Sequence, residues 1–280
     1  QTCALPIYQF ALADPGFGEL WVGNHTPTAF THVFASIQTL HGLNLTRISP
    51  KHFDIVVVDE FHHAAAASYQ ALLDHVQPRE LLGLTATPER SDGLPILHWF
   101  GDRIAAELRL WDAISQQRLV PFVYFGITDT IADYTHVPWT RGRGYDVAGI
   151  SNLLTGNDAW AGLVISQVRR RSADTTAMRA LGFCVSVDHA RYMARKFSEV
   201  GIPSVAIWSD TPDTERTASL HDLRDGRINV VFSVDLFNEG VDVPNVDTLL
   251  MLRPTDSPVL FLQQLGRGLR SHAEIGRAHV

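Results

Sequence analysis

Residues 55–62 read Ile-Val-Val-Val-Asp-Glu-Phe-His, so four aliphatic side chains are followed at once by two adjacent carboxylates. A run that is apolar at every position predicts a central strand of a parallel sheet that helices cover on both faces. The carboxyl end of such a strand lies at the edge of the sheet where α/β proteins bind ligands. Because an isolated Asp-Glu pair more often ends a strand in a solvated turn, the meaning of Asp59 and Glu60 depends on the rest of the chain.

The sequence around this strand repeats the same rhythm of short apolar runs and helical patterns, which predicts an α/β fold with parallel sheets. We place a domain boundary near residue 113, and a less regular zone follows to residue 172. The predicted strands are 20–22, 32–36, 55–58, 81–84, 181–185, 204–208, 229–234 and 248–252, and the predicted helices are 68–76, 188–200, 213–225 and 258–270.

Composition excludes several classes of protein. No run of eighteen apolar residues and no basic-then-apolar leader occurs in the 280 residues, so we expect a soluble, cytoplasmic protein with no membrane partner. The only cysteines, Cys3 and Cys184, are too few for a disulfide framework or a zinc cage. No oligomeric state follows from these features.

The net charge of −7 argues against a protein that coats nucleic acid by bulk electrostatics, but it leaves room for a local basic groove. Residues 1–112 hold 6 Lys or Arg against 12 Asp or Glu, whereas residues 113–280 hold 17 against 18. A surface that faces phosphates is therefore better supplied in the second half of the chain.

Small hydroxyl and polar residues follow other predicted strands. Thr85-Ala86-Thr87-Pro88 comes after strand 81–84, and Pro88 disfavours a helical conformation at Thr87. Gly240 permits close backbone approach, and Asp242 can bond a ribose hydroxyl or an arginine across a cleft. Each pattern is common alone. The residues Ser36, Gln38 and Thr39 either bond a nucleic-acid backbone or simply cap a helix.

Helix 258–270 has one apolar side and one side that carries Gln263, Arg267 and Arg270 within an arc of roughly 60°. Asp256 or Ser257 can cap this helix, with Pro258 in its first turn. Arginine suits phosphate because its charge is permanent and its guanidinium is planar. A solvated amphipathic helix is the alternative for this segment alone.

Taken in order, Asp-Glu-x-His, Thr-Ala-Thr, Gly-x-Asp and Gln-x-x-Gly-Arg-x-x-Arg resemble the motifs of superfamily 2 helicases and translocases. The resemblance covers about residues 20 to 272. Residues 59–63, 83–90 and 235–244 look closest to the bacterial DEAD/DEAH-type group that includes RadD-like proteins. The resemblance implies two RecA-like domains in tandem, with ATP between them and a nucleic-acid strand across both. DNA is the favoured partner.

The resemblance also implies a role for each matching residue. Asp59 would bind Mg²⁺, and Glu60 would act as the general base on water. The other implied catalytic residues are His62, Gln263, Arg267 and Arg270, the coupling residues are Thr85 and Thr87, the nucleotide contacts are Gly240 and Asp242, and the nucleic-acid contacts are Ser36, Gln38, Thr39, Ser186 and His189.

The family's phosphate loop ends in Gly-Lys-Thr or Gly-Lys-Ser, whose amides and lysine hold the β and γ phosphates. Lys51 and Lys196, the only lysines, stand in Ser-Pro-Lys-His and Ala-Arg-Lys-Phe, so neither fits this loop. We therefore expect an N-terminally truncated fragment with an incomplete first domain and little ATPase activity of its own. The alternative is a nucleotide-independent nucleic-acid-binding module that kept the helicase scaffold.

The two ends of the chain resemble translated sequencing adapters, QTCALPI at residues 1–7 and EIGRAHV at residues 274–280. Both segments are expected to be adapter-derived. The expected domains are a partial ATP-binding domain over residues 8–112, a linker or irregular start of the second domain over 113–172, and the C-terminal helicase domain over 173–273.

Overall fold

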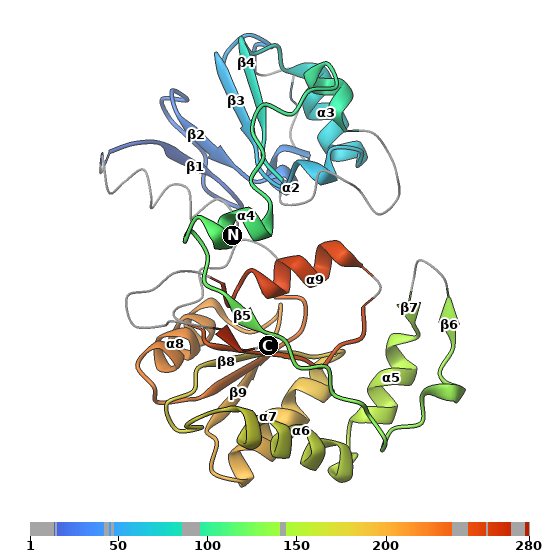
Figure 1. The fold of residues 1–280 in the computed structure, drawn as a ribbon. Coiled ribbons are helices and arrows are strands. Elements are labelled where there is room, and N and C mark those ends of the chain that lie inside the picture. Colours follow the sequence, from blue (N-terminus) through green and yellow to red (C-terminus); the bar gives the residue numbers. More distant parts are fainter. Residues whose placement is uncertain are drawn as a thin grey trace. The chain divides into compact units, whose positions relative to one another are not determined.

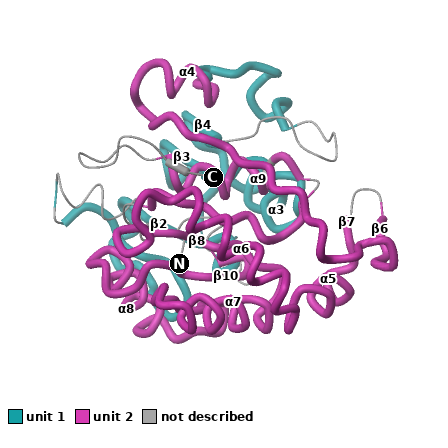
Figure 2. Tube along the Cα trace, turned by 60° about the horizontal axis from the view of Figure 1, so that its bottom comes forward, with its two compact units in different colours: residues 1–107, 240–242 teal, residues 108–239, 243–280 magenta. Residues whose placement is uncertain are grey.

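The computed structural model has two compact units, residues 1–107 with 240–242 and residues 108–239 with 243–280 (Figures 1 and 2). The structure describes residues 14, 16–41, 45, 48–85, 96–140, 144–236, 246–255, 257–269 and 278–279. Each unit is described by itself. Within the described part of the chain, no helix is long and apolar enough to cross a membrane.

Unit 1 contains two separate two-stranded parallel sheets. Strand β1 (Glu19–Trp21) pairs with β2 (Val33–Ala35), and β3 (Ile55–Val58) pairs with β4 (Glu80–Gly83). Helix α2 (Ile37–His41) follows β2. The 3-10 turn Phe61–His63 and helix α3 (Ala67–His75) connect β3 to β4, and a second 3-10 turn spans Leu97–Phe100.

The small core of unit 1 lies on one face of the β3–β4 sheet. Val58 packs there with Phe61 and Leu73 of α3, and Val56 is partly buried against the same cluster. On the other face, Ile55 is 64% exposed and Val57 is 54% exposed. The prediction that helices cover both faces of this strand was therefore wrong for the described residues, because successive side chains alternate and α3 covers only one side.

Unit 2 is built on a six-stranded parallel sheet with the order β5-β12-β11-β8-β10-β9. Helices α6 and α7 lie on one side of it and α9 on the other (Figure 1). The strands are β5 (Phe122–Val123), β8 (Ala180–Phe183), β9 (Ser204–Ile207), β10 (Val230–Ser233), β11 (Thr248–Met251) and β12 (Ala278–His279). Strand β12 lies within residues 274–280, the terminal segment that was expected to be adapter-derived.

The helices of unit 2 include two in the zone that the sequence pattern left irregular. These are α5 (Val147–Leu154) and the fourteen-residue α6 (Asp158–Arg171). The others are α4 (Leu110–Ser115), α7 (Val187–Glu199), α8 (Asp213–Arg224) and α9 (Pro258–Leu265), and a short hairpin of β6 (Trp139–Thr140) and β7 (Gly144–Tyr145) precedes α5.

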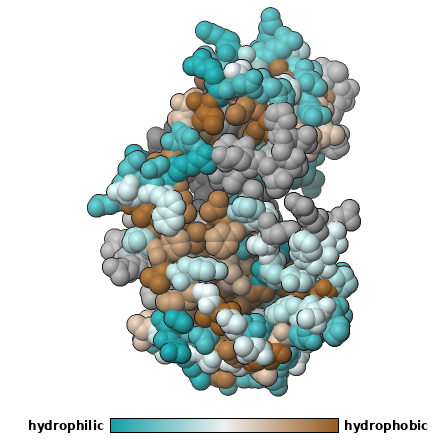
Figure 3. Space-filling view, turned by 45° about the vertical axis from the view of Figure 1, so that its right-hand side comes forward, coloured by the Kyte–Doolittle hydropathy of each residue, from teal (hydrophilic) through white to brown (hydrophobic). Residues whose placement is uncertain are grey.

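The core of unit 2 joins the two central strands to α5, α6 and α7. All four residues of β8 and all four of β10 are buried. Since a strand in the middle of a parallel sheet is covered on both faces, this burial is what the apolar runs 181–185 and 229–234 predict. Hydrophobic side chains also gather in the middle of the face shown in Figure 3, and exposed ones in unit 2 include Val123, Ile127 and Leu262.

Candidate functional site

Asp59, Glu60 and His62 form a polar cluster at the carboxyl end of β3. The backbone N–H of Glu60 donates to Asp59 Oδ1 at 2.9 Å. His62 Nδ1 lies 3.3 Å from Glu60 Oε2 and 3.2 Å from Oγ1 of Thr85, which follows β4. Side chains that are separate in the sequence therefore meet where the two parallel strands end, as the sequence pattern predicts for a ligand-binding edge.

The backbone at this turn is unusual. Glu60 has φ 49° and ψ 47°, the left-handed conformation that residues with a side chain rarely adopt. The next residue, Phe61, is 1% exposed, and its N–H donates to Leu84 O at 2.8 Å. Burial of the Phe61 ring holds the turn and keeps both carboxylates at the end of the strand. Backbone strain of this kind persists where the surrounding packing enforces it.

Phe61 also explains a glycine in the neighbouring strand. A Cβ on Gly83 would lie 2.8 Å from the Phe61 ring and 2.6 Å from the Phe100 ring. The two rings are themselves in edge contact, with centroids 4.8 Å apart. Only a residue without a side chain allows β4 to approach this aromatic pair, so Gly83 supports the position of the turn that carries Glu60.

The donors in the cluster fit Mg²⁺ bound together with phosphate. Asp59 is exposed and offers hard carboxylate oxygen, the ligand that Mg²⁺ prefers. No group of three or more metal-ligating side chains occurs among residues that the structure describes. Mg²⁺ at such sites usually keeps several waters and uses one or two carboxylates with substrate phosphates, so the single acidic pair is sufficient.

Four other predicted site residues, Thr87, Gly240, Asp242 and Arg270, lie outside the described residues. On α9, Ser257 is the N-cap and accepts from the N–H of Leu260, with Pro258 in the first turn, as predicted. The helix, however, ends at Leu265. It does not continue to residue 270 as predicted. Residues 266–268 form a turn and a bend, and glycine, at 266 and 268, is a poor helix former.

This early end changes the geometry of the predicted arginine face. Gln263 lies on α9, but Arg267 belongs to the turn that follows, where its N–H donates to Gln264 O. The prediction that Gln263 and Arg267 share one helical face was therefore wrong, because Arg267 lies beyond the end of α9. On the apolar side of this segment, Leu262 is 38% exposed, whereas Leu265 and Leu269 are buried.

Two of the residues predicted to contact a nucleic-acid backbone, Ser36 and Ser186, cap helices. Ser36 Oγ accepts from the N–H of Thr39 at 3.2 Å at the start of α2, and Gln38 is exposed. In unit 2, Ser186 is the N-cap of α7 and its Oγ accepts from the N–H of His189. Helix capping is the alternative that the sequence left open for residues 36–39. A role as a cap neither supports nor contradicts a contact with nucleic acid, which stays a prediction.

His189 is fully buried rather than at the surface. Its Nδ1 accepts from the N–H of Val185 at 3.4 Å, and its ring centroid lies 5.4 Å from that of Trp160. Burial lowers the pKa of His189 to about 4, so the imidazole is neutral at pH 7. In this position the side chain supports the β8–α7 turn. The neighbouring Ser186 contacts α5 instead, since its Oγ lies 2.6 Å from Ser151 Oγ.

Arg253 was not among the predicted site residues. It follows β11 and forms an ion pair with Asp235, which follows β10 in a left-handed conformation with φ 51°. A charged residue directly after the apolar run 248–252 was the available signal. The pair lies at the carboxyl end of the sheet in unit 2, the edge where parallel sheets bind ligands.

Two family models match the chain: "Type III restriction enzyme, res subunit" over residues 8–90 and "Helicase conserved C-terminal domain" over residues 164–272. A 51.5 kDa protein of a Lactococcus phage is 32% identical over 77% of this chain and 46% of its own length. The putative ATP-dependent helicase IRC3 of Saccharomyces cerevisiae is 27% identical over 89% of this chain and 36% of its own length.

Solved structures agree in fold. The fragment of a putative HsdR subunit of a type I restriction enzyme from Vibrio vulnificus YJ016 has a TM-score of 0.70 at 19% identity, covering 93% of this chain and 49% of that one. The chain spans less than half the length of the two curated relatives, the Lactococcus phage protein and the yeast helicase IRC3.

Proposed function

Because the chain belongs to the superfamily 2 helicase family, we propose that it is part of an ATP-dependent helicase or translocase that moves along nucleic acid, with DNA as the favoured strand. Its mixed α/β fold with parallel sheets is that of RecA-like helicase domains. The observation that carries the proposal is the cluster of Asp59, Glu60, His62 and Thr85 at the end of β3 and β4. Within the superfamily we favour the RadD-like group.

In this proposal Asp59 holds Mg²⁺, which when bound would neutralise charge on the nucleotide phosphates. Glu60 orients an attacking water and takes its proton. His62, within hydrogen-bonding distance of both Glu60 and Thr85, links the state of that carboxylate to the segment after β4. Such a link is what coupling hydrolysis to movement requires.

The second unit would supply the remaining groups. Gly240 and Asp242 would contact the nucleotide, Arg267 and Arg270 would stabilise charge that develops on the transferred phosphoryl group, and Gln263 would orient them. The proposed domains are residues 8–112 for the partial ATP-binding domain and 173–273 for the C-terminal domain, with 113–172 between them. Ser36, Gln38, Thr39, Ser186 and His189 are the proposed nucleic-acid positions.

One observation favours a second function, a nucleotide-independent nucleic-acid-binding module. Neither of the two lysines in the 280 residues stands in a Gly-Lys-Thr or Gly-Lys-Ser loop. The retained pair of Asp59 and Glu60 argues against it, because a scaffold that only binds has no use for a water-activating carboxylate.

The test compares ATP hydrolysis by the full-length protein with that of two variants. Glu60→Gln should lower the DNA-stimulated kcat by about 100-fold or more, the range expected when a general base is lost. Glu80→Gln is the control, because Glu80 is an exposed carboxylate at the opposite end of the same two-stranded sheet, and it should leave kcat unchanged. Equal rates for both variants would refute the role of Glu60. Salt-dependent DNA binding without any ATPase activity would favour the binding module.

A further inference from the structure

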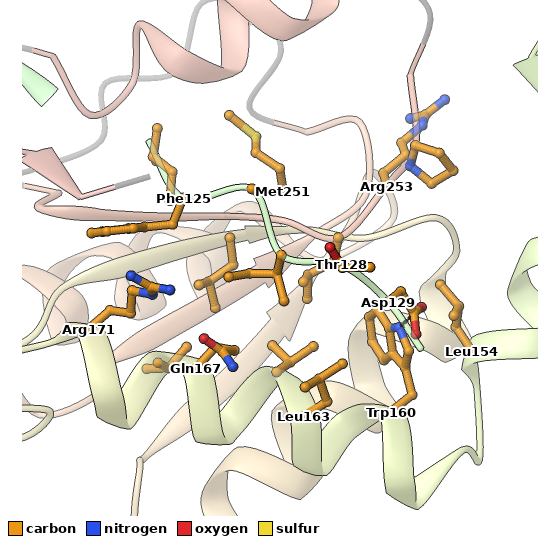
Figure 4. A pocket seen from close by; sticks show the side chains of 18 of the residues that line it. Phe125, Thr128, Asp129, Leu154, Trp160, Leu163, Gln167, Arg171, Met251 and Arg253 are labelled. Atoms are coloured by element: carbon orange, nitrogen blue, oxygen red, sulfur yellow. Dashed lines mark hydrogen bonds between the residues drawn. The ribbon is translucent and has the colours of Figure 1, made fainter. Parts of the chain in front are cut away.

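Unit 2 contains a cavity of about 750 Å³ that none of the proposed motor residues uses. It lies between the extended segment 124–129, helix α6 and the end of β11 (Figure 4). Ligand pockets in proteins have volumes of roughly 300–1,000 Å³, so the space is large enough for a small organic molecule. Every residue that lines it belongs to the described part of the chain.

The segment that covers this cavity is held at both ends. At one end Asp129 accepts hydrogen bonds from Trp160 Nε1 at 2.8 Å and from the Tyr134 hydroxyl at 2.6 Å. At the other end the guanidinium of Arg171 lies 4.0 Å from the centre of the Phe125 ring. These contacts tie the segment to α6 near both of its ends.

The walls are mainly apolar and rich in flat rings. The aromatic lining residues are Tyr124, Phe125, Tyr134, Tyr145 and Trp160, and Leu163 and Val164 of α6 add aliphatic surface. Aromatic side chains bind flat ligands by stacking, and stacking on a nucleic-acid base contributes about 1–3 kcal/mol. The lining therefore favours a planar ring over a flexible aliphatic chain.

Two polar atoms on α6 are buried in this apolar setting without a hydrogen-bond partner. They are Gln167 Oε1 and Arg171 Nε, one helical turn apart, and both side chains line the cavity (Figure 4). An unsatisfied buried polar atom costs about 1–3 kcal/mol, and a ligand can recover that cost. The other charged groups of the wall are already engaged, Asp129 by its four donors and Arg253 by Asp235.

We propose that this cavity binds a flat, uncharged heteroaromatic ring with an adjacent N–H and C=O, the lactam edge that thymine, uracil and hypoxanthine share. On binding, the Gln167 and Arg171 side chains would turn toward the ring, whose N–H would then donate to Gln167 Oε1 and whose carbonyl would accept from Arg171 Nε. The aromatic walls would stack on the faces of the ring. This site is independent of the motor function proposed above, because it shares no residue with it.

Two sources can supply such a ring, a free nucleoside or an unpaired base of a nucleic-acid strand. The test titrates the 280-residue chain with thymidine, with 3-methylthymidine and with an oligothymidylate. Methylation at N3 removes the donor without removing the ring, so thymidine should bind at least about tenfold more tightly than 3-methylthymidine. Thymidine binding identifies the free nucleoside as a ligand. Binding by the oligothymidylate that depends on Gln167, without binding of thymidine, identifies a base in a strand.

Variants of α6 test the anchors. Gln167→Leu and Arg171→Met should each weaken binding by about tenfold, since each removes one partner of the lactam edge. Arg170→Met is the matched control, because Arg170 is the adjacent, exposed arginine of the same helix, and it should bind like the parent chain. Thermal melting of each variant separates a lost contact from a lost fold.

Three results would overturn the proposal. The first is no binding of thymidine or of the oligothymidylate at millimolar concentration. The second is equal affinity for thymidine and 3-methylthymidine. The third is unchanged affinity in Gln167→Leu and Arg171→Met variants that melt like the parent chain.

Discussion

At the scale of single residues, the site depends on backbone geometry that residue type alone does not specify. The adjacent carboxylates Asp59 and Glu60 could be predicted at the end of a strand, because the apolar run before them is plain in the sequence. The left-handed conformation of Glu60 could not, since it follows from the burial of Phe61 beneath β4. Packing between distant segments decides which residue takes a positive φ, and a local sequence pattern does not predict this packing.

His189 illustrates the same limit with a different outcome. Its position one turn into α7 predicts a side chain near the end of the sheet, but the sequence does not say whether the ring faces solvent or core. The structure buries it against Trp160 and lowers its pKa to about 4. The nucleic-acid contact of His189 was predicted only from the resemblance to helicases, and it remains a prediction.

The buried imidazole makes stability depend on pH. In the unfolded chain the pKa returns to about 6.5, so the unfolded state takes up a proton between pH 6.5 and 4 while folded His189 stays neutral. Stability is therefore fully present above pH 6.5 and is lost as the pH falls toward 4, by an amount on the order of 3 kcal/mol. Urea unfolding at pH 7 and at pH 4.5 measures this loss.

His189→Asn should show a smaller loss of unfolding free energy between the two pH values than the parent chain, because the titrating group is gone. His136→Asn is the control, since the His136 side chain is 90% exposed, and it should retain the full loss. An identical pH dependence in His189→Asn and the parent chain would contradict the assignment.

At the scale of elements, several strands and helices were predicted from their patterns and others were missed. Strands β3, β8 and β10 form on the runs predicted at 55–58, 181–185 and 229–234, where they span Ile55–Val58, Ala180–Phe183 and Val230–Ser233. The helix predicted at 68–76 spans Ala67–His75. Helix α6 was missed although Asn157 precedes it as a capping residue, its side chain accepting from the N–H of Trp160. Its buried residues Trp160, Ala161, Ile165 and Val168 recur at helical spacing, so a helical period was present in the sequence.

Register between the central strands depends on a glycine. A Cβ on Gly182 of β8 would lie 2.3 Å from the ring of Phe232 in β10, and Phe232 is fully buried against Phe197. Gly182→Ala should therefore lower the free energy of unfolding by about 1–3 kcal/mol, because the ring has no space to move into. Urea unfolding at pH 7 checks the value.

Gly162→Ala provides the matched control. Gly162 lies within α6, is exposed, and no atom lies within 4 Å of a Cβ placed there. Alanine at this position should raise the free energy of unfolding by about 0.5–1 kcal/mol, since glycine is the poorer helix former. If both substitutions changed stability in the same direction, contact with Phe232 would not be the reason that residue 182 is glycine.

At the scale of the whole molecule, the residues proposed for hydrolysis are divided between the two units. The carboxylate cluster lies in unit 1, and Gln263 and Arg267 lie in unit 2. The order of these motifs along the chain could be predicted as a helicase pattern, because each motif sits at a strand end or on a helix. Their geometry across the two units depends on how the units associate, which the sequence pattern does not encode.

The lysines provide the last prediction. Lys196 Nζ is held by Asp158 at 2.7 Å and by Glu199 at 3.3 Å on the surface of unit 2. Lys51 is exposed in a turn of unit 1 and follows a proline. Phosphate loops hold the β and γ phosphates with a lysine that opens a helix after a glycine-rich turn, and neither residue is in that setting. Neither lysine of the sequence is therefore expected to hold the phosphates.

We expect this chain to hydrolyse ATP no faster than its own Glu60→Gln variant when both are assayed with saturating Mg²⁺ and ATP, with and without single-stranded DNA. The variant is the appropriate baseline because any contaminating ATPase would remain in it. Mg²⁺-dependent turnover that Glu60→Gln abolishes would contradict the prediction. It would also mean that other groups of this chain neutralise the phosphate charge that a loop lysine neutralises elsewhere, and Arg267 on the turn after α9 would be the first residue to substitute.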